Sequence, residues 1–233
     1  MAMNVSDDLE EQIAHVANRL GARLCNRMAF VGGCVTGLLV SDPIVRETIR
    51  ATKDIDLIVD VIGFADYVRL QESLRKRGFR ESMNEEVICR WSLDDLTVDI
   101  MPTDENILTF SNRWYPDAIR SAFRHKIRTG TKIHIVSPPF FLATKIEAFL
   151  GRGDGDFLAS RDIEDILTLL DGRPEVEVEI AAQNMEFRQY IAGHFSDFLS
   201  ESSFEYALES VTREQSARTQ ALFQRIQRIA QKG

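Results

Sequence analysis

The pattern of apolar and polar residues predicts alternating helices and strands in the first part of the chain. Apolar residues recur at helical spacing over residues 9–24, and Ser6 is a suitable N-cap for that helix. Residues 64–77 predict a second helix, ended by Gly78. Short apolar, β-branched or alternating runs predict strands over residues 28–31, 55–60, 86–91, 96–101 and 132–136.

The pattern becomes helical from Ser137 onward. Ser137-Pro138-Pro139 is a strong helix start, with serine as the cap and proline at the first helical position. Helices are expected over residues 138–150, 161–170, 174–182, 185–199 and 204–230. We therefore expect two domains, an α/β part at residues 1–136 and an α-helical part at residues 137–233.

The composition excludes several classes of protein but adds no helix or strand to this picture. The chain has 233 residues, 44% hydrophobic, with 28 Lys and Arg against 36 Asp and Glu, a net charge of −8. That balance argues against sequence-blind wrapping of nucleic acid, although it allows a small basic patch. The three cysteines form no disulfide framework, the N-terminus is acidic, and the longest apolar stretch, about 13 residues, is too short for a bilayer. We expect a cytoplasmic protein with no membrane partner.

Asp54-Ile55-Asp56 is the first candidate for chemistry. In a strand these two carboxylates point to the same face, about 6.5–7 Å apart. They repel each other unless a cation lies between them, and Mg²⁺ is bound in proteins through one or two carboxylates together with substrate phosphates. The alternative for so short a motif is a strand end whose carboxylates face water.

Two further features stand on either side of this motif. Gly32-Gly33 ends an apolar strand where a helix begins, so backbone N–H groups there could approach a phosphate without a Cβ in the way. The alternative is a tight turn for close packing. Asp99 lies in an apolar strand and needs a partner if it is buried. A metal shared with Asp54 and Asp56 would provide that partner; the alternative is that Asp99 faces solvent.

Together these residues resemble a known family. Gly32-Gly33, then Thr52-Lys53-Asp54-Ile55-Asp56-Leu57, then Asp99 on a later strand are similar to the nucleotidyltransferase superfamily of DNA polymerase β. Within it the chain most resembles bacterial AbiEii/MenT-like nucleotidyltransferases, which are toxins of toxin–antitoxin and abortive-infection systems. The resemblance covers about residues 28–171. It implies an α+β fold, with a nucleotidyltransferase core of mixed β-sheet and flanking helices, followed by an α-helical C-terminal domain.

The resemblance also implies an activity and roles for residues. The activity is Mg²⁺-dependent transfer of a nucleoside monophosphate from an NTP to an acceptor hydroxyl, with release of pyrophosphate. Asp54, Asp56 and Asp99 would hold the metal and act in catalysis. Lys145 and Asp162 would be further catalytic residues in the helical domain, and Asp165 is the alternative to Asp162, which we prefer because it directly follows Arg161. The residues implied to contact the nucleotide are Gly32, Gly33, Thr52, Lys53, Lys145 and Arg161.

The acceptor stays open at this point. The resemblance implies a tRNA 3′ end and a toxin neutralised by an antitoxin protein. Alternatives are an aminoglycoside-type small molecule, a protein side chain, or a non-catalytic module that binds a nucleotide or an antitoxin. Residues 113–132 are basic and include Trp114 and Tyr115, a composition that suits RNA by charge and stacking, or else a solvated helix face.

Overall fold

The chain forms two compact units. The computed structural model describes residues 5–81, 89–108, 112–152 and 155–233. The first unit consists of Met1–Gly37 and Arg50–Ser137, and the second of Leu38–Ile49 and Pro138–Gly233. The helical unit therefore also contains a segment that follows the Gly-Gly turn in the sequence.

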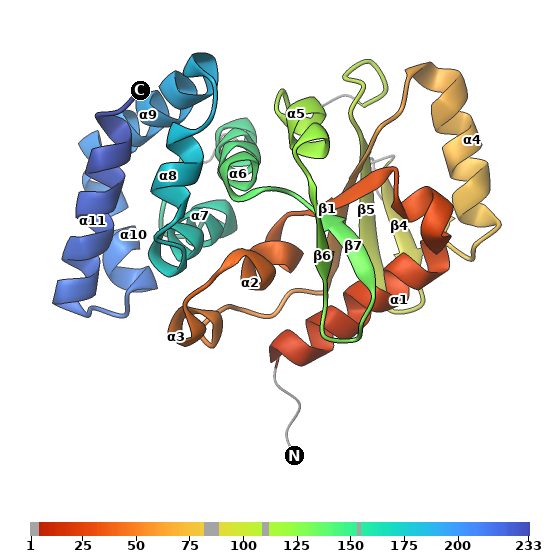
Figure 1. Ribbon diagram of the computed structural model, residues 1–233, viewed down its shortest axis with the longest axis horizontal. Coiled ribbons are helices and arrows are strands. Elements are labelled where there is room, and N and C mark those ends of the chain that lie inside the picture. Colours follow the sequence, from red (N-terminus) through yellow and green to blue (C-terminus); the bar gives the residue numbers. More distant parts are fainter. Residues whose placement is uncertain (1–4, 82–88, 109–111, 153–154) are drawn as a thin grey trace. The chain divides into compact units, whose positions relative to one another are not determined.

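The described residues of the first unit form a mixed seven-stranded sheet in the order β3-β4-β5-β2-β1-β7-β6, flanked by helices (Figure 1). The central strand β2 is antiparallel to its neighbour β1, whereas β1–β7 and β2–β5 are parallel pairs. The fold is therefore α+β. The strands are β1 Met28–Val31, β2 Asp54–Val59, β3 Arg80–Glu81, β4 Arg90–Leu93, β5 Leu96–Pro102, β6 Phe123–Lys126 and β7 Lys132–Ile135.

Helices pack on this sheet through the apolar faces that the sequence predicts. The longest is α1, in which Ile13, Val16 and Leu20 are fully buried. Burial of this stripe accounts for the helical spacing of the apolar residues. The helices of the first unit are α1 Val5–Cys25, α4 Gly63–Arg75 and α5 Tyr115–Arg120; the short 3₁₀ helix η1 Gly33–Val35 and α2 Thr36–Leu39 follow β1.

Most of the predicted strands are confirmed to within one or two residues. Of the strand predicted at 86–91, residues 86–88 lie outside the described residues, and β4 begins at Arg90. The basic segment 113–132 is not one helix. It contains α5 and then β6, which pairs with β7 in a hairpin, with Arg124 opposite His134. Two strands were thus missed, β6 and the two-residue β3, because neither has a long apolar run.

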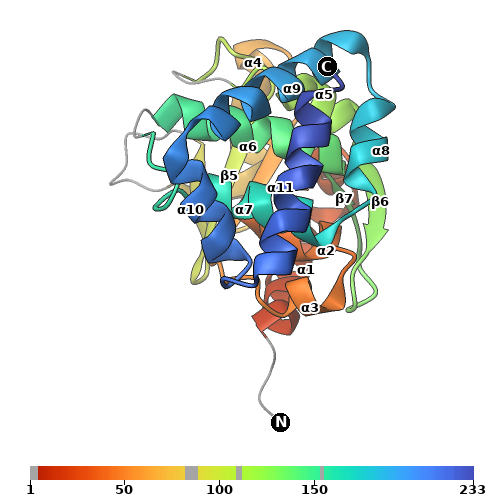
Figure 2. The same ribbon diagram turned by 90° about the vertical axis from the view of Figure 1, so that its left-hand side faces the viewer.

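The described residues of the second unit are helical, and Figure 2 shows α10 and α11 side by side. The apolar face of α7 is at its centre, with Ile163, Ile166 and Leu170 fully buried. The helices are α3 Pro43–Arg46, α6 Pro138–Arg152, α7 Arg161–Gly172, α8 Val176–Ala181, α9 Met185–Ser200, α10 Ser202–Val211 and α11 Ser216–Ala230.

The single helix predicted over residues 204–230 is wrong, because the chain forms α10 and α11 there. The buried Thr212 Oγ1 donates to the Leu208 carbonyl oxygen at 2.8 Å and ends α10. Arg213 and Glu214 then take left-handed backbone conformations, with φ of 53° and 57°. Periodicity did not reveal this break, because the apolar spacing continues on both sides of it.

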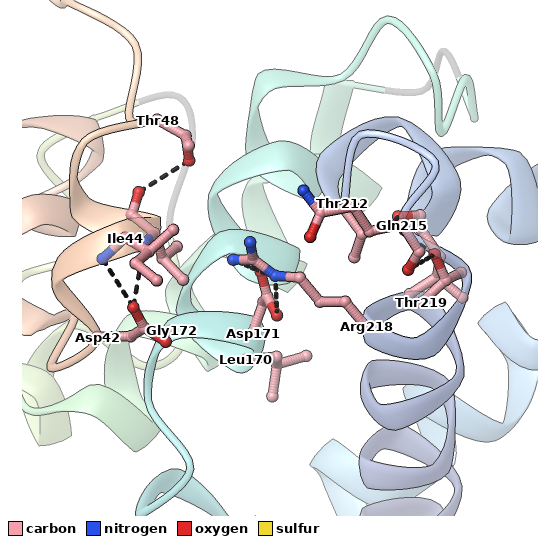
Figure 3. A network of polar contacts seen from close by, with 12 residues as sticks. Asp42, Ile44, Thr48, Leu170, Asp171, Gly172, Thr212, Gln215, Arg218 and Thr219 are labelled. Atoms are coloured by element: carbon pink, nitrogen blue, oxygen red, sulfur yellow. Dashed lines mark hydrogen bonds and ion pairs between the residues drawn. The ribbon is translucent and has the colours of Figure 1, made fainter.

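A polar network ties the segment 38–49 to α7 (Figure 3). Asp42 Oδ1 caps α3 by accepting the Ile44 N–H at 2.7 Å. The Gly172 carbonyl oxygen at the end of α7 accepts two successive backbone N–H groups before α3, each at 2.9 Å. The neighbouring Asp171 accepts from Arg218 Nε of α11 at 2.8 Å. One end of α7 therefore holds both α3 and α11. In the part of the chain that the structure describes, none of the helices has both the length and the apolar character of a transmembrane span.

Candidate functional site

The Asp54-Ile55-Asp56 motif opens β2, at the centre of the sheet. Ile55 is fully buried, whereas Asp54 is exposed and Asp56 is half-buried. This alternation puts both carboxylates on one face of the strand. The strand begins with a local hydrogen bond in which the Asp54 N–H donates to Thr52 Oγ1 at 3.2 Å. Thr52 and the exposed Lys53 thus directly precede the two acids.

Asp99 lies beside Asp56 on the neighbouring strand. In the parallel pairing of β2 and β5, Asp56 is opposite Asp99 and Asp54 is opposite Thr97. Adjacent strands are about 4.8 Å apart, so the three acids share one face at the start of β2 and the middle of β5. Like charges directly opposite each other destabilise a sheet. The arrangement therefore needs cationic neighbours or a cationic ligand.

The Gly-Gly turn lies against the Asp56 carboxylate. Val31, the last residue of β1, is paired with Asp56, and Gly32 follows with φ of +68°. A Cβ atom on Gly32 would overlap the Asp56 carboxylate and would come within 2.8 Å of Asp56 Cγ. In the next turn, the buried Cys34 Sγ donates to the Val31 carbonyl oxygen at 3.0 Å. Gly32 is therefore required both by its backbone conformation and by the position of Asp56.

An arginine that the sequence reasoning missed holds Asp99. Arg90 Nε and Nη2 donate to the two Asp99 carboxylate oxygens, each at 2.8 Å. The side chains are 32% and 14% exposed. The antiparallel register of β4 and β5 sets Arg90 opposite Asp99. The Asp94-Asp95 turn could have revealed this pair, because a tight hairpin turn fixes which residues face each other.

The donor set bears on the expected metal. Among the residues that the structure describes, no group of three or more histidine, cysteine, aspartate or glutamate side chains is placed to hold an ion. Asp54 and Asp56 offer two hard oxygen ligands on one face, while both Asp99 oxygens accept from Arg90. Since Mg²⁺ is held by one or two carboxylates plus substrate phosphates, these residues fit a Mg²⁺ ion that binds together with phosphates.

A nearby thiol is not a nucleophile. Cys89 precedes Arg90 and is buried, and its burial, with a further contribution from the Asp99 charge, raises the pKa of the Cys89 thiol to about 12. The thiol therefore stays protonated at neutral pH, and the thiolate is the reactive form.

The predicted residues of the second unit form a cluster of their own. Lys145 Nζ of α6 lies 3.0 Å from Asp162 Oδ1 and 2.6 Å from Asp165 Oδ2 of α7. The side chains of these three residues are 11%, 2% and 5% exposed. Arg152 pairs with the other Asp162 oxygen. The alternatives Asp162 and Asp165 thus both contact Lys145, and Arg161 is exposed at the first residue of α7.

This cluster is internally neutral. Two cationic and two anionic side chains meet, and a buried charge is tolerated when it is paired in this way. The resemblance implies that Lys145 contacts the nucleotide; in the structure its side chain is buried and pairs with carboxylates. Its contacts hold the start of α7 to the middle of α6.

The prediction that Trp114 of the basic segment could stack on an RNA base is wrong. Its side chain is buried at 5% exposure, so it presents no ring face to a base. Tyr115 Oη donates to Met101 Sδ at 3.0 Å, and Arg113 lies over the Trp114 ring, 5.0 Å from its centroid. Both aromatic rings thus pack within the unit.

Comparison with known proteins adds no family: neither a protein-family model nor a curated protein matches the chain. The case for a function therefore comes from the geometry of β2, β5 and the Gly-Gly turn.

Proposed function

We propose that the protein is a Mg²⁺-dependent nucleotidyltransferase, which moves a nucleoside monophosphate from an NTP to an acceptor hydroxyl and releases pyrophosphate. The observation that carries the proposal is the position of Asp56, between Gly32 and Asp99. Carboxylates set opposite each other are unfavourable for the sheet alone, and the one charge of Arg90 faces the three acids Asp54, Asp56 and Asp99. They become favourable when a phosphate-bound cation approaches, and a turn without side chains beside them leaves room for phosphates.

The residues of the first unit have distinct roles in this proposal. Asp54 and Asp56 hold the metal–nucleotide complex, and the Gly32-Gly33 turn lets the phosphates approach the backbone. Lys53, exposed next to Asp54, contributes positive charge near the phosphates. When bound, Mg²⁺ neutralises phosphate charge and orients the reacting groups. Most of the catalytic effect in such transfers comes from positioning and charge neutralisation.

Asp99 would act while Arg90 holds it in place. Each of its oxygens accepts one hydrogen bond from Arg90 and keeps a further lone pair for a cation or for the acceptor proton. The Arg90 guanidinium fork, which matches phosphate as well as carboxylate, adds positive charge beside these acids. The predicted roles of Lys145, Asp162 and Arg161 in transfer stay predictions, as do the tRNA acceptor and the antitoxin partner.

Transfer of labelled nucleotide tests the proposal. The protein is incubated with each α-labelled NTP and Mg²⁺, first with total RNA, then with total protein, then with an aminoglycoside panel. We expect labelling of one acceptor class by the wild type and by Asp95→Asn, an exposed acid in the β4–β5 turn. Asp56→Asn removes a metal ligand and should abolish labelling. Equal labelling by wild type and Asp56→Asn would show that the carboxylate mechanism is wrong.

Nucleotide binding provides a second, acceptor-free test. Because Asp54 and Asp56 alone make an incomplete metal site, Mg²⁺ without nucleotide should stabilise the protein little, and NTP with Mg²⁺ should stabilise it clearly against thermal unfolding. Equal stabilisation by NTP in EDTA would contradict the site. Stabilisation by Mg²⁺–NTP without transfer to any acceptor would favour the non-catalytic nucleotide-binding module.

A further inference from the structure

Four arginines line one open pocket of the first unit. Arg23 and Arg27 come from the end of α1 and the residues after it, and Arg69 and Arg77 come from α4 and its C-terminal extension (Figure 1 shows both helices). The pocket measures about 350 Å³, and Asp66 is the acid among the described residues that line it. The lining therefore carries a charge of about +3 in a chain whose net charge is −8.

Two of the arginines are anchored by hydrogen bonds. Arg27 Nη2 donates to Asp66 Oδ2 at 2.8 Å. Arg77 Nε donates to the Leu20 carbonyl oxygen at 2.8 Å, and its Nη1 donates to Ser73 Oγ at 2.6 Å. These bonds hold the two guanidinium groups in place before any ligand arrives. A preorganised donor loses less conformational entropy when it binds an anion.

The other two arginines are open to solvent. Arg69 is 70% exposed and lies 3.6 Å from Asp66, which it shares with Arg27. Arg23 is exposed in the last turn of α1. Stabilisation of helix C-termini accounts for cations at the ends of α1 and α4, but Arg69 lies in the middle of α4. One carboxylate does not neutralise four guanidinium groups, so an anion with several acceptor oxygens would relieve their repulsion.

The pocket is separate from the carboxylates. Arg27 directly precedes β1, where Met28 pairs with Val59, and Val31 at the other end of the same ladder pairs with Asp56. Arg27 and Val31 are four residues apart along this strand, which corresponds to about 13 Å. A phosphate in the arginine pocket is therefore not one of those held next to Asp56.

We infer that the arginine pocket binds a phosphate group of the acceptor. This inference rests on the proposed nucleotidyl transfer, because that reaction is what gives the protein an acceptor substrate. Guanidinium forks bind phosphate oxygens in pairs, and the Ser73 hydroxyl adds a further polar group to the wall. The same charge repels the ammonium groups of an aminoglycoside. The phosphate comes from an RNA backbone or from a small phosphorylated molecule, and the test separates these two sources.

Binding is measured by fluorescence anisotropy with a labelled short single-stranded RNA, in EDTA and without NTP, and by competition with inorganic phosphate. The Arg23→Gln/Arg69→Gln variant should bind RNA at least about tenfold more weakly, because it loses two charged hydrogen-bonding groups. Its salt dependence should fall by about 1.4 in the slope of log K against log salt. Arg213→Gln/Lys232→Gln, which changes two exposed residues of the second unit and carries the same change in charge, should bind like the wild type.

A variant that should raise the RNA affinity distinguishes a binding role of the pocket from a loss of structure. Asp66→Asn removes the one acid from the lining but keeps an oxygen acceptor for Arg27, so it should bind RNA more tightly than the wild type. RNA binding much tighter than that of inorganic phosphate identifies a nucleic-acid backbone; similar affinities identify a small phosphorylated acceptor.

The inference is overturned if the wild type binds neither probe, if both double variants lose affinity equally, or if Asp66→Asn weakens binding. Because nucleotide and metal are left out, a failed transfer assay does not affect this result. In the same way, a failed binding assay leaves the Asp56 experiment intact.

Discussion

The carboxylate of Asp56 fills the space beside Gly32 in which any other residue would place its Cβ atom. Such an atom would come within 2.8 Å of Asp56 Cγ and 2.9 Å of Asp56 Cβ, and it would overlap the carboxylate itself. Because Asp56 is paired with Val31 on one side and with Asp99 on the other, rotation of its carboxylate alone does not relieve the contact with Asp56 Cβ. The Gly-Gly turn and the acid at position 56 are therefore matched to each other.

We expect Gly32→Ala to lower the free energy of unfolding through both backbone strain and this overlap. A left-handed φ costs an L-residue on the order of 1–3 kcal/mol, and displacement of Asp56 adds to it. Gly63→Ala is the matched control, because Gly63 has a similar φ of +74° and nothing within 4 Å of its Cβ position. Urea unfolding should show the larger loss for Gly32→Ala; equal losses would mean that Asp56 moves aside freely.

Replacing Arg90 should cost more stability than replacing its partner Asp99. Arg90→Gln leaves Asp99, 14% exposed, facing Asp56 without its two charged hydrogen bonds, and should cost about 1.5–3 kcal/mol of stability. Asp99→Asn should cost less, because Arg90 is 32% exposed and can turn toward water, and because one of two facing negative charges disappears.

Mg²⁺ should distinguish these variants further. In Arg90→Gln the facing carboxylates Asp56 and Asp99 need another cation, so added Mg²⁺ should restore part of the lost stability. In Asp99→Asn it should not. Thermal unfolding with Mg²⁺ or with EDTA measures the difference, and an identical Mg²⁺ response in the two variants would contradict a cation site between β2 and β5.

Replacing Lys145 tests whether this residue stabilises the fold or binds a phosphate. Lys145→Met leaves Asp162 and Asp165 buried without the cation they share, and breaking a buried pair in this way costs about 3–5 kcal/mol. The triple variant that also carries Asp162→Asn and Asp165→Asn should recover much of this loss, because it has no buried carboxylate left without its lysine. Chemical denaturation followed by helical circular dichroism measures both. Unchanged stability of Lys145→Met would return Lys145 to the phosphate-binding role that the family resemblance implies.

Local patterns in the sequence predicted the elements of the site but not all of their pairings. Asp54 and Asp56 share a face because strands alternate, and this follows from the sequence alone. The position of Asp99 beside Asp56 depends on the order and register of strands, which the acids themselves do not specify. Arg90 was missed because its partner lies across a hairpin rather than within its own strand.

Burial and long-range contacts explain the other points at which the structure differs from the sequence predictions. Lysine is usually solvated, so nothing in the sequence around Lys145 indicates that two carboxylates from another helix enclose it. The break at Thr212 depends on one side-chain hydrogen bond to the Leu208 carbonyl oxygen, which the apolar spacing does not reveal. The attachment of residues 38–49 to the Gly172 carbonyl oxygen is likewise a long-range contact.

The last prediction concerns acid stability and Glu177. This residue of α8 accepts from Arg228 of α11, with Oε2 3.0 Å from Nε and Oε1 2.6 Å from Nη2, and Arg225 lies 3.5 Å from Oε1. The hydrogen bond from Arg228 holds the pKa of Glu177 below its ordinary value of 4.5, although partial burial opposes the shift. A lowered pKa in the folded state means that ionised Glu177 stabilises the fold above pH 4.5. That contribution is lost as the pH falls through the lowered pKa.

We therefore expect Glu177→Gln to be less stable than the wild type at neutral pH and the difference to close as the pH falls below about 4.5. Other carboxylates also titrate in this range, so the informative quantity is the difference in unfolding free energy between the two proteins at each pH. Glu205→Gln, which replaces an exposed glutamate of α10, should follow the wild type throughout. A difference that stays constant on the acid side would show that Glu177 acts through packing, because packing does not depend on its charge, whereas the ion pair with Arg228 does.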